Sequence, residues 1–492
     1  MNDKEIKSKA VTSVIWKFLE RMGAQVVSFI VSIILARILD PADYSVVSIV
    51  IIFFAFANVL ISGGFNSALI QKKNAEPEDY SSVLHVSVII SIVIYLLLFI
   101  VSPYIAQAYE QPALTTIIRV MALTLPINAV KSIWCAYISA TFQFKKFFFS
   151  TIGGTCVSAV IGVALAYGGA GAWALVAQQM SNIFIGTAIL LFTTKIHITL
   201  KISFTRLKGL LQYGWKVFVS SIIGMIYSEI IPIVIGLKYT SADLAFYTKG
   251  RSFPTLITTT TTNTFSAVLF PTLSKYQDDK EKLLAGTRLF IRITSFMAFP
   301  LMLGFFSLAE NFVLVVLTEK WMPAVPYIKI FCIASMFEMV HTGNCETIKA
   351  MGRSDIYLIM EIIKKAGYFA TIALFLFFTN SPTTLALAFL VCTVIALVVN
   401  SIPNRKLLGY KFSHQFADLL PNLLTAIVMS IVVSLVGIME IDRTLLLVVQ
   451  VAVGAIIYIA TNLLIKNPAL YYILKNAKEL FFSGASEPAK SE

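Results

Sequence analysis

Long apolar runs recur along nearly the whole chain and are separated by short polar segments. The apolar runs are continuous rather than alternating, and most are long enough to cross about 30 Å of hydrocarbon as a helix. We therefore predict an all-helical fold with fourteen spans. They cover residues 12–38, 43–69, 81–104, 113–138, 147–167, 171–193, 209–237, 242–272, 287–309, 324–348, 355–378, 383–402, 417–438 and 443–465.

Composition supports the same fold class. The chain has 492 residues, of which 58% are apolar and 13% are charged, whereas soluble domains average about 25% charged residues. A single soluble core cannot bury this many apolar runs, so the sequence indicates a polytopic membrane protein. The N-terminal segment has no short apolar stretch followed by small residues, so we expect no cleavable signal.

The basic residues predict how the spans are oriented. The two termini and every second connection together contain 24 Lys and Arg, whereas the other connections contain four, Arg37, Lys238, Lys320 and Arg443. Basic loops stay in the cytoplasm, so we expect both termini there. The net charge of +13 then reflects topology. It does not indicate nucleic-acid binding, because the basic residues are spread over many loops.

One helix end occurs twice, 200 residues apart. The segment "IVSIILARILDPADYS" covers residues 30–45, and "IIPIVIGLKYTSADLA" covers residues 230–245. Further along, "GGFNSALIQKK" (63–73) and "VLFPTLSKYQDDK" (268–280) follow the next spans. The spacing predicts two six-helix bundles in the same orientation, the parallel repeat of rocking transporters. We place the bundles at residues 1–205 and 206–404, an accessory pair of lipid-facing spans at 405–470, and a cytoplasmic tail at 471–492.

Several of these segments resemble a known family. "SIILARILDPADYS", "GGFNSALIQKK", "AFYTKGRSFPTL", "VLFPTLSKYQDDKEKL" and "LTEKWMPAVP" look like the Wzx-type lipopolysaccharide and exopolysaccharide flippases, in particular the colanic-acid and teichuronic-acid branch. That family belongs to the multidrug/oligosaccharidyl-lipid/polysaccharide (MOP) exporter superfamily. The resemblance implies a MATE-like fold. It also implies translocation of undecaprenyl-pyrophosphate-linked oligosaccharides across the bacterial inner membrane for polysaccharide biosynthesis, by alternating access through a central cleft.

Charged residues within the predicted spans are the candidate functional groups. Eleven of the 39 Lys and Arg lie within or at the edge of spans, against about six acidic residues. A charge at membrane depth costs about 2.5–3.5 kcal/mol, so such residues either reach an interface or share a hydrated cavity. The excess of cations favours an anionic substrate such as a lipid-linked acidic oligosaccharide. The candidates for a cationic cleft are Arg21, Lys131, Lys216, Lys249 and Arg251.

Each cation also has a structural interpretation. Arg21 lies deep in the first span and could simply pair with Glu20, while Lys131 and Lys216 could extend to the cytoplasmic surface. Lys249 and Arg251 are two residues apart, which places them on different faces of one helix. Three acidic residues are candidates for proton or sodium coupling, Glu20, Glu229 and Glu338; the alternative for each is a structural ion pair or packing.

Two other functions remain to be weighed. A multidrug or cation antiporter of the same superfamily would need unpaired acids for cationic drugs. A membrane polysaccharide polymerase or ligase would need a large outer loop, whereas every outer connection here is short. Flipping changes no bond, so we expect neither catalytic residues, nor a bound metal, nor a cofactor. A polysaccharide polymerase and its chain-length machinery are the expected protein partners.

Overall fold

A computed structural model describes residues 3–72, 75–141, 143–199, 202–274, 276–277, 279–378 and 381–474. Every element of regular secondary structure in these residues is a helix, and none is a strand. Residues 475–492 of the predicted tail lie outside the described residues. The helices are α1 Asp3–Ile38, α2 Pro41–Ser62, α3 Phe65–Gln71, α4 Pro77–Ala108, α5 Ala113–Ala122, α6 Thr124–Ala140, α7 Phe144–Tyr167, α8 Ala172–Thr193, α9 Phe204–Lys238, α10 Ser241–Ser274, α11 Lys280–Phe312, α12 Val325–Ala350, α13 Ser354–Phe378, α14 Pro382–Leu408, α15 Phe412–Val436 and α16 Arg443–Leu464.

Twelve segments of the described chain are helical, long and apolar enough to cross a membrane. They correspond to twelve of the fourteen predicted spans. The other two predicted spans, 242–272 and 355–378, are helices α10 and α13, but they are not among the twelve. Helix α13 carries Glu361, Lys364 and Lys365 within its length. The all-helical membrane fold is therefore confirmed, whereas the count of fourteen spans is not.

Two predicted spans are broken in ways that we did not expect. The second span, predicted as 43–69, ends at Ser62, and α3 begins after Gly63 and Gly64. Both glycines have positive φ, 50° and 75°, a conformation that ends a helix and that glycine adopts without strain. The fourth span divides between α5 and α6. Pro126 explains this break, because its ring clashes with the carbonyl four residues earlier, at the last residue of α5.

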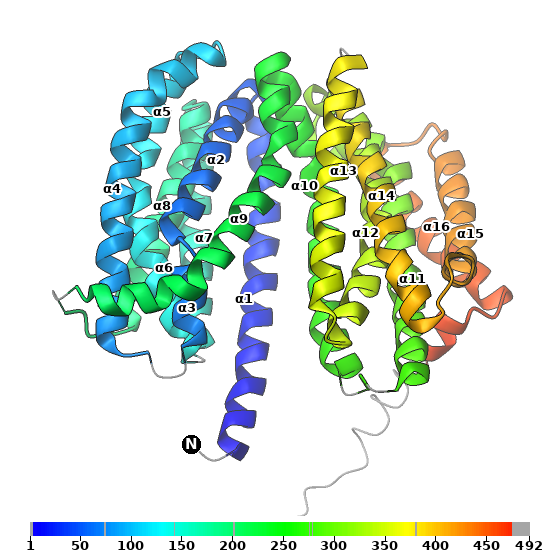
Figure 1. Ribbon diagram of the computed structural model, residues 1–492. Helices are drawn as coiled ribbons and strands as arrows, with labels where there is room; N and C mark the ends of the chain where they lie inside the picture. The colour runs from blue at the N-terminus through cyan, green and yellow to red at the C-terminus, as the bar shows by residue number, and fades with distance from the viewer. Residues whose placement is uncertain are drawn as a thin grey trace, which may run out of the picture. The chain divides into compact units, whose positions relative to one another are not determined.

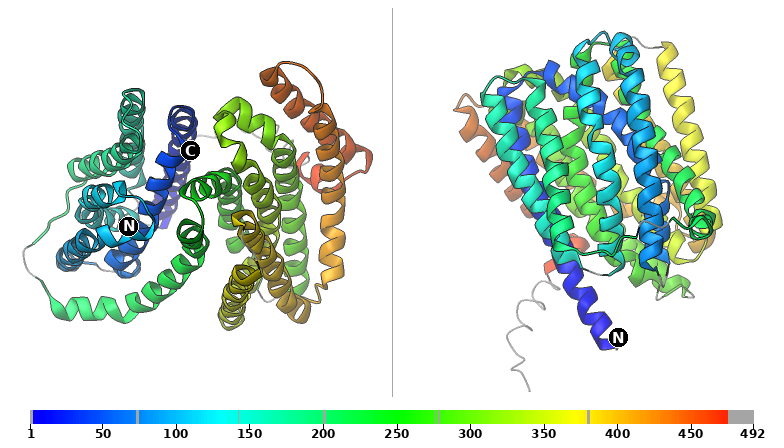
Figure 2. Two further views of the ribbon diagram at one scale, coloured as in Figure 1. Left: turned by 90° about the horizontal axis from the view of Figure 1, so that it is seen from above. Right: turned by 90° about the vertical axis from the view of Figure 1, so that its left-hand side faces the viewer.

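The chain forms two compact units, Met1–Ala245 and Phe246–Glu492. In the first unit, α4, α6, α7 and α8 run side by side (Figures 1 and 2). In the second unit, α11 packs with α12 and α15, and α14 lies beside α12 and α13. Helix α9 belongs to the first unit, although the repeat predicts that it begins the second six-helix bundle. The bundle limits 1–205 and 206–404 stay a prediction.

The repeated segments form the same turn. At the start of α2, the Asp43 carboxylate accepts a hydrogen bond from the Asp40 backbone N–H at 3.1 Å. At the start of α10, the Asp243 carboxylate accepts one from the Thr240 backbone N–H, also at 3.1 Å. A carboxylate in the first turn satisfies an otherwise unpaired N–H and complements the helix dipole. The repeated Ala-Asp therefore has a direct structural reason.

Helix α9 contacts other parts of the first unit at two places. It begins along one end of the unit and then curves to run with the other helices (Figure 1). Near the curve, Gly214 faces Gly64, and a Cβ atom on Gly64 would lie 2.0 Å from the Gly214 carbonyl oxygen. Only glycine permits so close a contact between the two backbones.

Ion pairs fix the beginning of α9. Arg206 lies 2.6 Å from Glu76, 3.2 Å from Glu78 and 3.5 Å from Asp79, and Lys72 lies 2.7 Å from Asp79. The hydrogen bond to Glu76 raises the pKa of the Arg206 guanidinium. These ion pairs join the connection between α3 and α4, and the first turn of α4, to the beginning of α9.

Candidate functional site

A polar pocket of about 410 Å³ opens in the first unit between α2, α3 and α6. We call it the Lys131 pocket. Its lining residues are Asn58, Ile61, Ser62, Asn66, Asn128, Lys131, Ser132 and Cys135. Among the described residues, the lining thus combines three asparagines, two serines and one lysine, and it includes no carboxylate.

Local structure brings these side chains together. Asn128, Lys131, Ser132 and Cys135 occupy positions i, i+3, i+4 and i+7 of α6, so they share one face of the helix. The left-handed turn at Gly63 and Gly64 redirects the chain, and Asn66 then joins the pocket from α3. The helix break that we did not predict therefore supplies one wall of the pocket.

The Lys131 side chain extends through the unit toward α8. A Cβ atom on Gly186 would lie 3.4 Å from the Lys131 Nζ, so glycine leaves room for the ammonium group. Glu20 on α1, whose exposed fraction is 7%, attracts Lys131 electrostatically. Glu20 also forms an ion pair of 2.8 Å with Lys17. Two predicted site residues, Lys131 and Glu20, are thus brought close in the fold.

The other predicted residues of the first unit lie elsewhere. Arg21 on α1 and Lys216 on α9 are exposed. Glu229 accepts a hydrogen bond of 3.0 Å from the adjacent Ser228 hydroxyl. The proposed roles of these three residues in substrate binding or ion coupling stay predictions.

In the second unit, the two predicted cations of α10 face aromatic rings. The Lys249 Nζ lies 5.6 Å from the centre of the Trp321 ring and 5.7 Å from that of Phe253, and Lys249 is only 5% exposed. The Arg251 guanidinium lies 5.8 Å from the Phe389 ring. Arg251 also attracts Glu338 on α12 electrostatically. A cation over an aromatic face is stabilised by the ring quadrupole.

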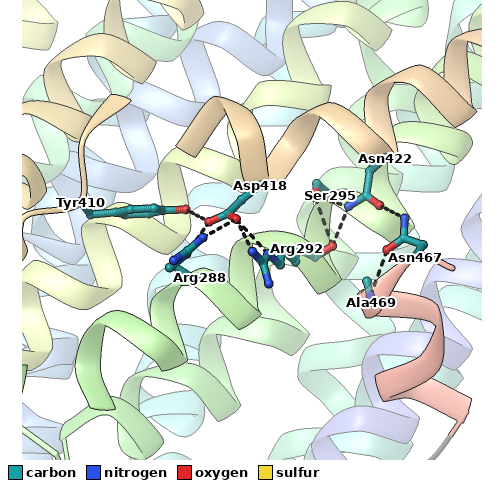
Figure 3. Close-up of polar contacts among 8 residues, drawn as sticks. All are labelled: Arg288, Arg292, Ser295, Tyr410, Asp418, Asn422, Asn467 and Ala469. Atoms are coloured by element: carbon teal, nitrogen blue, oxygen red, sulfur yellow. Dashed lines mark hydrogen bonds and ion pairs between the residues drawn. The ribbon is translucent and has the colours of Figure 1, made fainter. Parts of the chain in front are cut away.

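Asp418 forms a charged cluster that the sequence analysis missed (Figure 3). Its carboxylate accepts hydrogen bonds from Arg288 Nε at 2.7 Å, from Arg292 Nε at 3.0 Å and from the Tyr410 hydroxyl at 2.8 Å. Burial and the hydrogen bond to Asp418 raise the pKa of the Tyr410 hydroxyl. The sequence contained a signal for this cluster. Asp418 is an acid at the start of an otherwise uncharged span, and Arg288 and Arg292 are four residues apart.

Polar contacts attach the predicted accessory pair, α15 and α16, to α11; that their other faces meet lipid stays a prediction. Beyond Asp418, Asn422 donates to Ser295 at 2.7 Å, and Tyr458 donates to the Phe296 carbonyl at 2.7 Å. These contacts dock both helices on α11, so one face of each is buried in protein. In a bilayer such polar groups need internal partners, which explains why they lie on the docked face.

The same three helices, together with Ile257 of α10, line an apolar pocket of about 450 Å³. Leu301, Gly304 and Phe305 of α11 line one side, and Met429 of α15 and Gly454 of α16 line the other. We call it the α11–α16 groove. Its chemistry suits a hydrocarbon chain rather than a polar group.

These features define a class, a polytopic membrane transport protein. The chain belongs to the polysaccharide biosynthesis protein family, whose model matches residues 34–326. An uncharacterized membrane protein from the cps region of Klebsiella pneumoniae is 27% identical over 94% of this chain and 97% of its own. The succinoglycan biosynthesis transport protein ExoT of Rhizobium meliloti is 23% identical over 96% of this chain and 97% of its own.

Solved structures support the fold. The lipid II flippase MurJ, in an inward closed conformation, matches with a TM-score of 0.72 over 92% of this chain and 98% of its own, at 13% identity. An inward-facing multidrug resistance MATE transporter of the MOP superfamily matches with a TM-score of 0.58 over 78% of this chain and 94% of its own, at 13% identity. The expected MATE-like fold is confirmed.

Proposed function

We propose that this protein moves lipid-linked oligosaccharides across the bacterial cytoplasmic membrane, from the inner to the outer leaflet, for polysaccharide biosynthesis. The proposed substrate is an undecaprenyl-pyrophosphate-linked repeat unit. A pyrophosphate and its sugars cannot cross about 30 Å of hydrocarbon without a replacement for their water. A protein that supplies polar and cationic groups along the path removes that barrier, and no covalent bond needs to change.

The Lys131 pocket is the observation that carries this proposal. It combines a lysine with hydrogen-bonding side chains inside a membrane fold, and no carboxylate of the described chain lines it. The family membership of residues 34–326 supports polysaccharide biosynthesis as the process. The ExoT relative, a succinoglycan transport protein, supports transport as the role.

The α11–α16 groove supports a lipid-linked substrate. It is apolar and lies among helices that traverse the membrane. We propose that the polyprenyl tail lies along this groove while the sugars follow the hydrated path. The polar contacts that dock α15 and α16 on α11 keep the groove walls in place.

Orientation, coupling and partners complete the proposal. The charge bias of 24 to 4 among the loops supports both termini in the cytoplasm. We propose alternating access, coupled to protons or sodium through Glu20, Glu229 or Glu338. Transport that is indifferent to pH, sodium and membrane potential would contradict the coupling. A polysaccharide polymerase would use the delivered repeat units.

The test is reconstitution of the purified protein in proteoliposomes. The substrates are a fluorescent polyprenyl-pyrophosphate oligosaccharide and, as the competing class, a cationic dye. We expect translocation of the lipid-linked oligosaccharide and no dye transport. Dye transport without oligosaccharide translocation would instead assign the protein to drug transport, in line with its MATE structural relative, a multidrug resistance transporter.

A further inference from the structure

We propose that the Lys131 pocket binds one anionic sugar unit, either a uronate or a phosphate-linked sugar. The inference rests on the proposed function and names the part of the substrate that this pocket recognises. The five polar residues around Lys131, which are Asn58, Ser62, Asn66, Asn128 and Ser132, become specificity residues.

Three side-chain amides of the pocket have hydrogen-bonding groups without a partner among the described residues. The Asn66 Oδ1 is buried and has no hydrogen-bond partner among the described residues. Within the same part of the chain, neither Asn58 nor Asn128 has a side-chain partner. A side-chain amide both donates and accepts, which is what adjacent sugar hydroxyls require. A buried acceptor without a partner is costly, and a sugar hydroxyl would remove that cost.

The two serines contribute acceptors. The Ser62 hydroxyl donates to the Val59 carbonyl at 3.1 Å, and the Ser132 hydroxyl donates to the Ala129 carbonyl at 2.8 Å. Each proton is therefore used within its own helix, and the oxygen lone pairs remain. Hydroxyl groups of a ligand can donate to these oxygens.

Charge selects an anionic sugar over a neutral one. Among the described residues, Lys131 is the only charged residue that lines the pocket. Glu20, which attracts Lys131 electrostatically, is itself paired with Lys17. These three described residues carry two positive charges and one negative charge. This excess of positive charge favours binding of a carboxylate or phosphate and disfavours binding of a cationic drug.

The pocket size limits the ligand to part of an oligosaccharide. Its volume of about 410 Å³ falls near the lower end of the range for small-molecule sites, about 300–1,000 Å³. A whole repeat unit with its lipid exceeds this volume. The pocket therefore holds the charged sugar while the rest of the substrate lies outside it.

Cys135 provides a local probe. It lines the pocket and is a partly exposed free thiol. The rate of maleimide labelling at Cys135 is measured in the full-length protein in nanodiscs. The control is a Lys208→Cys variant, because Lys208 is exposed and precedes the membrane-length segment Gly214–Lys238 of α9. The soluble probes are glucose, glucuronic acid, glucose 1-phosphate and inorganic phosphate.

We expect an anionic sugar to protect Cys135 but not the thiol introduced by Lys208→Cys. A ligand at about ten times its Kd should slow labelling about tenfold. Protection by glucuronic acid alone identifies a uronate, and protection by glucose 1-phosphate alone identifies the phosphate-linked sugar. The proposal fails if glucose protects as well as the anionic sugars, if phosphate alone matches glucose 1-phosphate, or if no probe protects.

Variants link protection to the named residues. Lys131→Met and Asn66→Leu should abolish protection, and Lys208→Met, at an exposed lysine of α9, should retain it. Full protection in both pocket variants would overturn the assignment. Translocation assays separate this inference from the proposed function. Wild-type translocation that both pocket variants retain fully would refute the pocket alone. Sugar protection without any wild-type translocation would refute the flippase function while the pocket stands.

Discussion

Arg288 and Asp418 form a two-point ion pair across helices α11 and α15. The Arg288 Nε lies 2.7 Å from Asp418 Oδ2, and the Nη2 lies 2.9 Å from Oδ1. Asp418 is 4% exposed and also accepts from Arg292. The buried carboxylate of Asp418 therefore neutralises part of the charge of two arginines and stabilises the packing of α15 on α11.

Loss of this acid should destabilise the protein. Asp418→Ala leaves two guanidinium groups without their partner, and because both are partly exposed we expect a loss of about 2–4 kcal/mol in the free energy of unfolding. The measurement is denaturant unfolding in detergent. Asp355→Ala, which removes an exposed ion pair with Arg353, is the control and should cost less than about 1 kcal/mol. Equal effects would show that the Asp418 cluster is dispensable.

The crossing of Gly64 and Gly214 predicts a steric effect. Gly64→Ala would place a Cβ atom 2.0 Å from the Gly214 carbonyl oxygen, so α9 must shift away. Gly169→Ala has the same backbone strain, with a φ of 77°, but no atom within 4 Å of the new Cβ. Gly169→Ala should cost about 1 kcal/mol, and Gly64→Ala should cost clearly more. Comparable melting temperatures would rule out the close contact.

The repeated turns at the starts of α2 and α10 predict matched effects. Asp43→Ala and Asp243→Ala each remove a hydrogen bond to a backbone N–H at a helix start. Each should cost about 1 kcal/mol of stability. Thermal unfolding of both variants provides the test. A large loss for one and none for the other would show that the two turns are not equivalent.

The α11–α16 groove predicts a dependence on the lipid tail. Gly304→Leu fills the groove, because a Cβ at this position already lies 3.5 Å from the Met429 methyl group. We expect the translocation rate of a long-tailed substrate to fall about tenfold, an effect of about 1.4 kcal/mol, with a short-tailed analogue much less affected. Gly367→Leu, with a neighbour at a similar 3.6 Å but outside the groove, is the matched control. Equal loss for both tails would contradict a tail site.

Most of the fold could be predicted because hydropathy reports the length of each span. Twelve predicted spans are membrane-length apolar helices in the structure. The breaks after Ser62 and after Ala122 were missed, because a positive φ at Gly63 or a proline clash is a local backbone property that an apolar run does not reveal. The assignment of α9 to the first unit depends on packing, which a repeat in the sequence does not specify.

The candidate site could be predicted only in part. Lys131 and Glu20 were singled out because charges are costly in a membrane. Asn58, Asn66 and Asn128 were missed, since a polar amide in a span is uncharged and its neighbours on other helices are unknown. The two arginine partners of Asp418 lie 126 and 130 residues away, and only tertiary structure brings them together.

The most direct test of the account is the initial rate of translocation of a polyprenyl-pyrophosphate acidic oligosaccharide in proteoliposomes. Wild type is compared with Arg21→Ala and with Lys249→Met/Arg251→Met, and unfolding curves verify that each variant is folded. Loss of a charge-assisted contact costs about 1.5–3 kcal/mol, so we expect the variants to be at least about tenfold slower than an active wild type. Folded variants that match wild type would contradict the cationic path, and an inactive wild type would contradict the flippase function.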